Sequence, residues 1–373
     1  MNSLNNISRE KGATTIFMAV VLVAIIGIAA FAVDIGYGLV VKTQLQNVAD
    51  TGTLAGTREL ALIYQQQDGW STTDSYKYHY LTDSEQSRVA AKVNSFSQLN
   101  KAGGVAITIR TNDDIIWGKF NKENGELEPT TPARTGVTGI KVTARRDQNV
   151  NGVLATGLGR VLGINSLSVQ ASSASTLSSL RKVPSGKLGI PVGISKFWFT
   201  ARNSPCGKHD TAGHGIRLYP TGPQTGETIT NSQSCAGWHT YTEQPASAAK
   251  LKSILTDLKS GSYVSPPVEA NVDSFQFTGG AVATAFNNMK LLYETSKNSS
   301  GTWTTIVPVY EAADCANPQG AIKIVGFATA YIYSVTTSPA NTIDATIDCN
   351  IVDFGEGGGD DYGTLVGSPG MVQ

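Results

Sequence analysis

The stretch "GATTIFMAVVLVAIIGIAAFAV" (Gly12–Val33) contains no charged residue and is followed directly by "DIGYGLVVKTQLQNVADTGTLAG" (Asp34–Gly56). Its 22 residues are enough for a helix to cross a hydrocarbon layer of about 30 Å at about 1.5 Å per residue. Arg9 and Lys11 precede the stretch, and positive charge is retained on the cytoplasmic side of a membrane. The sequence therefore predicts a single-pass helix, with residues 1–11 in the cytoplasm and the bulk of the chain exported.

The helical pattern does not stop where the apolar stretch ends. Apolar and small residues continue at helical spacing, at Val41, Leu45, Val48, Gly52 and Ala55. A cleaved signal peptide is the alternative, because "IAAFA" (Ile28–Ala32) is similar to a small-residue cleavage site. The continuous pattern favours a retained anchor whose second half packs on its own domain.

These residues resemble the N-terminal segment of TadE/TadG-like proteins of the Tad (tight adherence) Flp-pilus system. That family has a charged residue and a glycine before an apolar run, then A-x-D-x-G, then a hydrophobic-Q-N-A-A-D tract followed by L-A-G. The matching residues here are Arg9, Gly12, Ala32, Asp34, Gly36, Leu45, Gln46, Asn47, Asp50, Leu54, Ala55 and Gly56. Thr51, Gly52 and Thr53 stand where the family has alanines, which weakens the helix at that point. The resemblance covers about 50 residues, and the rest of the chain matches only loosely.

The resemblance implies a single-pass protein of the bacterial inner membrane, with its bulk in the periplasm or outside the cell. It also implies other pilus-assembly proteins as partners, with helix–helix contacts to pilin-like subunits. Type IV prepilins are cut after a glycine and carry glutamate five residues on. A cut after Gly12 would put Phe17 at that position, so a filament-forming subunit is not favoured.

Composition excludes one class of partner and sets the redox compartment. Lys+Arg and Asp+Glu balance at 29 each, so there is no basic field to hold nucleic acid. The four cysteines all lie in the exported half, which predicts two disulfides. Pairing nearest neighbours gives Cys206–Cys235 and Cys315–Cys349. The alternative is a zinc site, because Cys206, His209, His214, Cys235 and His239 cluster, but export favours the disulfide. No metal or other cofactor is expected.

The expected fold class is α+β, with the transmembrane helix extending into a pilin-like stalk, a small α+β domain and a β-rich, disulfide-stapled domain. The expected boundaries are 1–11 (cytoplasmic), 12–33 (span), 34–180 (stalk helix and α+β domain), 181–354 (β-rich domain) and 355–373 (flexible tail). Periodicity predicts helices at 84–100, 150–162, 248–258 and 281–293, and strands at 105–110, 115–120, 139–144, 167–175, 304–310, 321–335 and 342–352. Residues 121–136 are expected to be a loop and 181–189 a linker. "GEGGGDDYG" (Gly355–Gly363) is glycine-rich and predicts a mobile tail, with a calcium loop as the alternative.

Two features of the N-terminal helix suggest contacts. Asp34 either sits among lipid headgroups or meets a partner within the bilayer. The small residues Ala49, Gly52, Ala55 and Gly56 form a stripe that would let another helix approach closely, and we interpret it as a docking face for a pilus subunit.

No catalytic motif of the G-x-S-x-G, Walker A or H-E-x-x-H type occurs in the sequence, so the chain is not expected to be an enzyme. The predicted function is that of a membrane-anchored component of Tad/Flp-type pilus assembly or anchoring. The alternative is a surface adhesin or binding module on the same anchor, with Trp198, Trp238 and Trp303 in Gly/Ser/Thr-rich surroundings.

Overall fold

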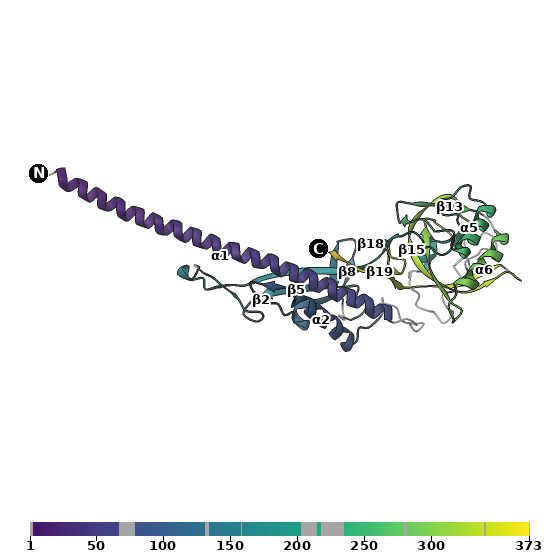
Figure 1. Ribbon diagram of the computed structural model, residues 1–373, viewed down its shortest axis with the longest axis horizontal. Coiled ribbons are helices and arrows are strands. Elements are labelled where there is room, and N and C mark those ends of the chain that lie inside the picture. Colours follow the sequence, from purple (N-terminus) through teal and green to yellow (C-terminus); the bar gives the residue numbers. More distant parts are fainter. Residues whose placement is uncertain are drawn as a thin grey trace.

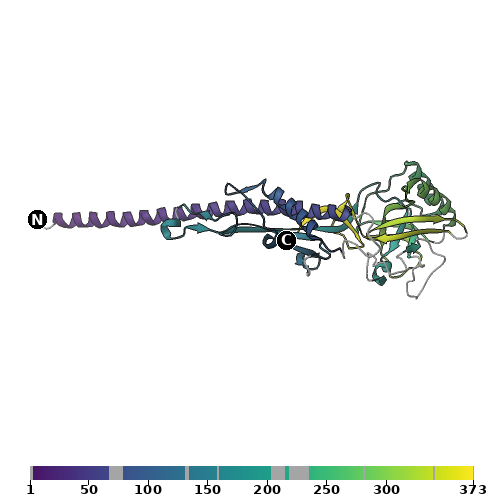
Figure 2. The same cartoon turned by 90° about the horizontal axis from the view of Figure 1, so that it is seen from below.

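The protein is elongated, with a long N-terminal helix at one end, a helix-and-sheet stalk module in the middle and a β-rich distal lobe at the other end (Figure 1, Figure 2). This computed structural model describes residues 3–66, 79–130, 134–157, 159–202, 215–217, 235–279, 282–338 and 341–372. Side chains of the long helix are described from residue 14 onward.

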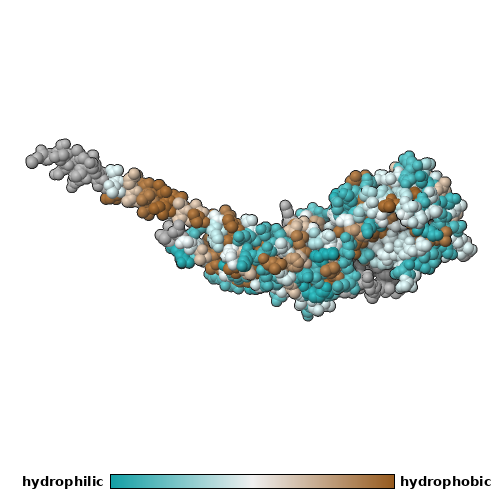
Figure 3. Space-filling view, viewed as in Figure 1, coloured by the Kyte–Doolittle hydropathy of each residue, from teal (hydrophilic) through white to brown (hydrophobic). Residues whose placement is uncertain are grey.

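The N-terminal segment forms one uninterrupted helix, α1 (Ser3–Gln66), as the sequence predicts. Its 64 residues correspond to about 96 Å at 1.5 Å per residue. Within residues 14–66 it is long and apolar enough to cross a membrane. Most of its side chains from Thr14 to Val33 are exposed, which gives a bare apolar band next to the N-terminus (Figure 3).

The stalk module is an antiparallel sheet, except for one parallel pair at its edge, and the second half of α1 covers it. A second helix, α2 (Asp83–Ser97), packs against α1. Its strands follow the order β17 (Asn350–Val352), β19 (Thr364–Val372), β8 (Val169–Val183), β5 (Gly139–Arg146), β3 (Ile115–Asn121) and β4 (Glu126–Pro129). Two short strands, β12 (Val268–Glu269) and β18 (Glu356–Gly357), also pair with β8. The core between helix and sheet includes Leu45, Val48 and Leu60 of α1 and Ile140 and Val142 of β5, all fully buried.

Short elements of the stalk module correct several expectations. These are β1 (Lys101–Ala102), β2 (Val105–Ala106), α3 (Thr111–Asp114), β6 (Leu154–Ala155), η1 (Gly159–Leu162, a 3-10 turn) and β7 (Ser166–Leu167). The strand expected at 105–110 is only two residues long and pairs with β1, and the loop expected at 121–136 contains β4.

The helix expected at 150–162 does not form; the chain instead makes the β6–β7 hairpin with η1 in its loop. Asn151 and Gly152 both have positive φ, 59° and 69°, a conformation that ends a right-handed helix.

The distal lobe is built on a second sheet with helices packed beside it. Its strands follow the order β10 (Gly215–Arg217), β16 (Thr342–Asp348), β15 (Gln319–Thr336), β14 (Trp303–Tyr310), β9 (Val192–Ser195) and β11 (Ala236–Trp238), and β13 (Ser274–Thr278) also pairs with β15. The helices are α4 (Lys196–Arg202), α5 (Ala248–Ser260), η2 (Ala283–Ala285) and α6 (Phe286–Ser296). The expected helix at 248–258 is confirmed and ends at Gly261, which has the left-handed conformation of a C-cap.

The distal lobe is inserted in the sequence between β8 and β17, two strands of the stalk sheet that are separated by β19. The chain leaves the stalk module along β8 and returns through β17 and β19, which pairs antiparallel with β8 (Figure 1). The linker expected at 181–189 is therefore wrong in part, because β8 runs to Val183 and both Val183 and Leu188 are fully buried.

The flexible tail expected at 355–373 is also wrong. Residues 364–372 form β19, and Leu365 and Val366 are buried in the core. The glycine-rich run ends at Gly363. The residues that follow it form a strand of the stalk sheet.

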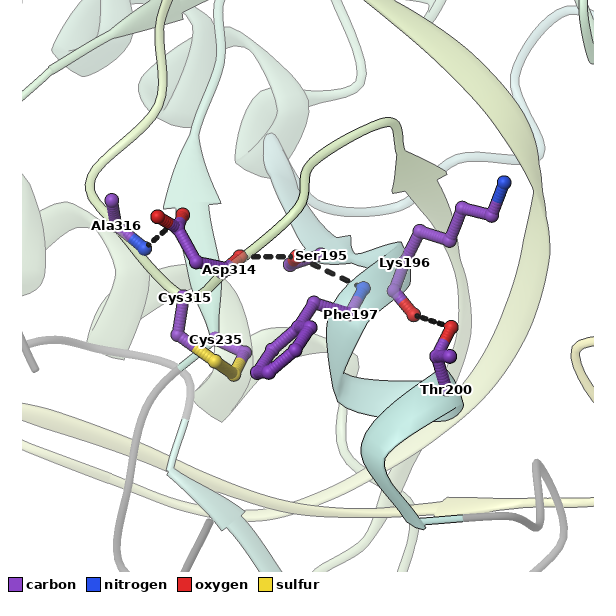
Figure 4. Close-up of a disulfide and its surroundings, with 8 residues drawn as sticks. All are labelled: Ser195, Lys196, Phe197, Thr200, Cys235, Asp314, Cys315 and Ala316. Carbon is purple, nitrogen blue, oxygen red and sulfur yellow. Dashed lines mark hydrogen bonds between the residues drawn. A yellow bond between two sulfur atoms is a disulfide. The ribbon is translucent and has the colours of Figure 1, made fainter. Parts of the chain in front are cut away.

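One disulfide in the distal lobe joins Cys235 to Cys315 (Figure 4). It ties the start of β11 to the loop after β14, beside the turn in which Ser195 Oγ donates a 2.8 Å hydrogen bond to the Asp314 carbonyl. Both predicted pairs, Cys206–Cys235 and Cys315–Cys349, are therefore wrong. Cys349 is also disulfide-bonded, and Cys206 lies outside the described residues.

Candidate functional site on the stalk helix

The face of α1 at the end of the apolar band carries a carboxylate with two backbone donors. Gly157 N donates a 2.8 Å hydrogen bond to Asp34 Oδ1, and Gly159 N donates a 2.6 Å hydrogen bond to Asp34 Oδ2. Both donors come from the β6–β7 hairpin, which follows Asp34 in the sequence by more than a hundred residues. Hydrogen bonds to an ionised carboxylate are stronger than neutral ones, so this contact fixes the hairpin to the helix.

Two small residues lie on the same face of α1 as Asp34, and one of them, Gly38, lies next to the hairpin. Ala30 and Gly38 lie four residues before and after Asp34, a spacing that puts all three on one side of a helix. Ala30 is only 8% exposed, and a Cβ on Gly38 would lie 3.7 Å from Leu167 Cδ1 of β7. The sequence predicts that Asp34 either sits among lipid headgroups or meets a partner within the bilayer. The structure shows a contact, and the partner is the backbone of the same chain.

The next predicted residues join the helix to the sheet. Gln46 Nε2 donates hydrogen bonds to Asp50 Oδ1 at 2.8 Å and to the Ser172 carbonyl of β8 at 3.2 Å. Asn47 is exposed, and a Cβ on Gly36 would meet no atom within 4 Å. Gly36 and Asn47 are thus on the open side of α1, whereas Gln46 joins α1 to β8 and is itself hydrogen-bonded to Asp50 of the same helix. Gly12 lies within α1, among the residues whose side chains are not described.

The small-residue stripe faces inward, which corrects our interpretation of it as an external docking face. A Cβ on Gly52 would lie 2.6 Å from Ser97 Oγ of α2, and a Cβ on Gly56 would come closer still to Ile140 Cδ1 and Val93 Cγ2. Ala49 is fully buried and Ala55 is half-buried. The helix that this stripe lets approach is the protein's own α2.

The two threonines on this face contribute polar contacts that the sequence did not suggest. Thr53 Oγ1 donates a 3.0 Å hydrogen bond to the Ile140 carbonyl, and Ser175 Oγ donates a 2.7 Å hydrogen bond to Thr57 Oγ1. Thr53 is one of the departures from the alanine tract of the resembling family, and it is fully buried against the sheet. The available signal was the spacing of Thr53 and Thr57 by one helical turn on the same side as Gly52 and Gly56.

We expect Gly56→Leu to destabilise the stalk module by at least about 1–3 kcal/mol, because the new side chain would overlap two core side chains. Urea unfolding of the full chain in detergent, followed by circular dichroism, measures the loss. Gly36→Leu is the matched control, because its Cβ enters open space and leucine favours a helix over glycine. Equal stability of the two variants would show that this face of α1 is not packed as described.

The structure describes two of the residues considered as zinc ligands in the distal lobe, and both make other contacts. Cys235 is in the disulfide, and His239 is buried with its Nδ1 accepting a 3.1 Å hydrogen bond from Tyr241 N. Burial lowers the pKa of His239 to about 3, so the ring is neutral near pH 7. His209 and His214 lie outside the described residues, and within the described ranges no three His, Cys, Asp or Glu side chains are placed to share a metal.

The fold and this helix face define a class of protein: a helical stalk with an apolar helix long enough to span a membrane at one end and a β-rich lobe at the other. Residues 12–59 match the family model described as putative Flp pilus-assembly TadE/G-like, which confirms the resemblance seen in the sequence. The matched segment runs from the apolar band through Asp34 to the buried glycine face. Comparison with the curated proteins and with the solved structures found no match.

Proposed function

We propose that this chain is a membrane-anchored, non-catalytic component of Tad/Flp-type pilus assembly or anchoring, with its N-terminus in the cytoplasm and its bulk outside the inner membrane. The observation that carries the proposal is the TadE/G-like match over residues 12–59, because that segment forms both the apolar band and the packed half of α1. Arg9 and Lys11 before the band support the orientation.

The stalk geometry supports a role in holding the distal lobe away from the membrane. From Asp34 to the end of α1 at Gln66 the helix rises about 48 Å at 1.5 Å per residue. The lobe is joined to the stalk sheet through two strands, β8 and β17, so it is held by more than a single flexible linker. Such a spacer suits a subunit that links the inner membrane to an assembly further out.

The alternative function, an adhesin or binding module, is favoured by one observation: the distal lobe lies farthest from the apolar band (Figure 2). Val264, Val272, Leu291 and Tyr333 of this lobe are exposed apolar or aromatic residues. In that case the stalk serves only to present the lobe.

Two strains test the proposal against the alternative: a clean deletion, and a variant with residues 184–349 replaced by a short glycine-serine linker. We expect the deletion to abolish surface pili, because a component of the assembly is missing, and pili counted by electron microscopy measure this. An adhesin predicts normal pili in both strains, with surface adherence lost.

The linker variant should be present at the same level as the unmodified protein and should resist carbonate extraction. These two controls show that the variant is made and inserted in the membrane. Normal piliation in the deletion strain would contradict the assembly proposal.

A further inference from the structure

We propose that the β6–β7 hairpin, described at residues 154–157 and 159–167, lies on the bilayer surface and contacts phospholipid headgroups around the end of α1. We call this segment the collar hairpin. The inference rests on the proposed membrane anchorage of α1, and goes beyond it by assigning a second, non-helical lipid-contacting surface.

The position of the collar hairpin along α1 carries the argument. Asp34 is the first charged residue after the uncharged stretch Gly12–Val33, so it marks the outer end of the span. The hairpin backbone donates two hydrogen bonds to Asp34, and η1 within the hairpin contacts α1. The hairpin is therefore fixed at the level where the helix leaves the hydrocarbon layer.

The side of α1 that carries Asp34 is also buried one turn earlier, at Ala30. Ala30 is 8% exposed, although Ile28 and Phe31 beside it are 72% and 42% exposed. It lies one turn before Asp34, about 6 Å closer to the centre of the span. Of the stalk elements, the hairpin end reaches farthest toward the N-terminal end of α1 (Figure 1, Figure 2). Because the hairpin is fixed to Asp34, one turn from a buried residue of the span, we place it in the headgroup layer.

The exposed residues of the collar hairpin are of types that suit the headgroup layer. Arg160 is exposed, and it is the one charged residue in the sequence of the hairpin. Ile164 is 40% exposed, and on the helix Ile35 and Tyr37 are exposed within one turn of Asp34. A cation with apolar and aromatic neighbours is typical of residues at the membrane interface.

The hydrogen bonds to Asp34 complete the electrostatic argument. A carboxylate that faced lipid phosphates would be repelled by them, but both oxygens of Asp34 accept hydrogen bonds from the hairpin backbone. The charge that the hairpin presents outward is then that of Arg160, which attracts phosphate.

Fluorescence quenching in vesicles tests the inference. The full chain carrying Ile164→Cys is labelled with an environment-sensitive fluorophore, without reductant, and reconstituted into phosphatidylethanolamine–phosphatidylglycerol vesicles. Nitroxides attached to lipid headgroups should quench this label several-fold more than a label at Val272→Cys, an exposed site on the distal lobe. Adding Asp34→Ala should lower the quenching at residue 164 toward that of the Val272 control, because the hairpin is released from the helix.

A third label, at Leu22→Cys in the apolar band, is read with nitroxides attached to the lipid acyl chains, because residue 22 lies near the middle of the uncharged stretch, and it separates the two hypotheses. Lipid quenching at residue 22 together with full access of iodide to residue 164 would overturn the collar while leaving the anchor intact. Loss of lipid quenching at residue 22 as well would overturn the anchorage and the collar with it.

Discussion

A chain that ends at Gly363 should fail to fold its stalk module, although it lacks only the last ten residues. Those residues include β19, which lies between β17 and β8 and buries Leu365 and Val366. Burying two such side chains stabilises by about 3–6 kcal/mol, which is a large part of the about 5–15 kcal/mol typical of a folded domain. Truncation also removes the 2.8 Å hydrogen bond that Arg58 of α1 donates to the Gly367 carbonyl.

Limited proteolysis of the full-length and truncated chains in detergent measures this loss. A chain that ends at Gly370 is the matched control, because it keeps the buried part of β19 and removes Met371, which is 47% exposed. The control should resist protease almost as the full chain does, and the shorter chain should be cut throughout the stalk module. Equal resistance of all three chains would show that residues 364–370 do not stabilise the stalk module. It would favour the mobile tail expected from composition.

Features set by local periodicity could be predicted from the sequence. The long helix, α5 with its glycine cap and the alternating burial of β16 all follow from residues a few positions apart. In β16, Ile343, Ala345 and Ile347 are buried on one face as the alternation indicates, although the single strand expected at 342–352 ends at Asp348 and residues 350–352 form β17 in the stalk sheet. These predictions succeeded because burial of an apolar face stabilises each element, and the period of that face can be read from residues close together in the sequence.

The features that the sequence did not reveal depend on pairing between distant residues. The Asp34 carboxylate meets Gly157 and Gly159 across more than 120 positions, and β19 pairs with a strand that begins at Val169. No local pattern states which carboxylate a glycine-rich turn will meet. A usable signal existed in G-x-G at 157–159, because two glycines two residues apart weaken a helix and favour a turn.

The small-residue stripe shows a different limit. Gly52 and Gly56 predict correctly that a helix packs closely against α1, but such spacing does not say whether that helix belongs to the same chain. The structure supplies α2. The side of the helix that remains open includes Gly36 and Asn47, and a partner helix would have to use that side.

Removing the disulfide should be the second large effect. We expect Cys235→Ala to destabilise the distal lobe by about 4 kcal/mol, because the bond closes a loop across a sequence separation of 80 residues and so restricts the unfolded chain. The bond also holds β11, which pairs with β9 at the end of the distal sheet. Urea unfolding of the full chain without reductant, followed by tryptophan fluorescence, measures the difference.

The pairing itself can be tested by comparing the single variants with the double variant. If Cys235 and Cys315 are bonded to each other, either substitution removes the whole cross-link, so Cys235→Ala, Cys315→Ala and the double variant should be about equally unstable. If each cysteine were bonded elsewhere, as nearest-neighbour pairing predicts, the two losses would add. Mapping of non-reduced peptides should then recover the fragment holding Cys235 joined to the one holding Cys315. Additive losses together with a Cys315–Cys349 peptide would show that the distal lobe is stapled differently, with β11 held by another part of the chain.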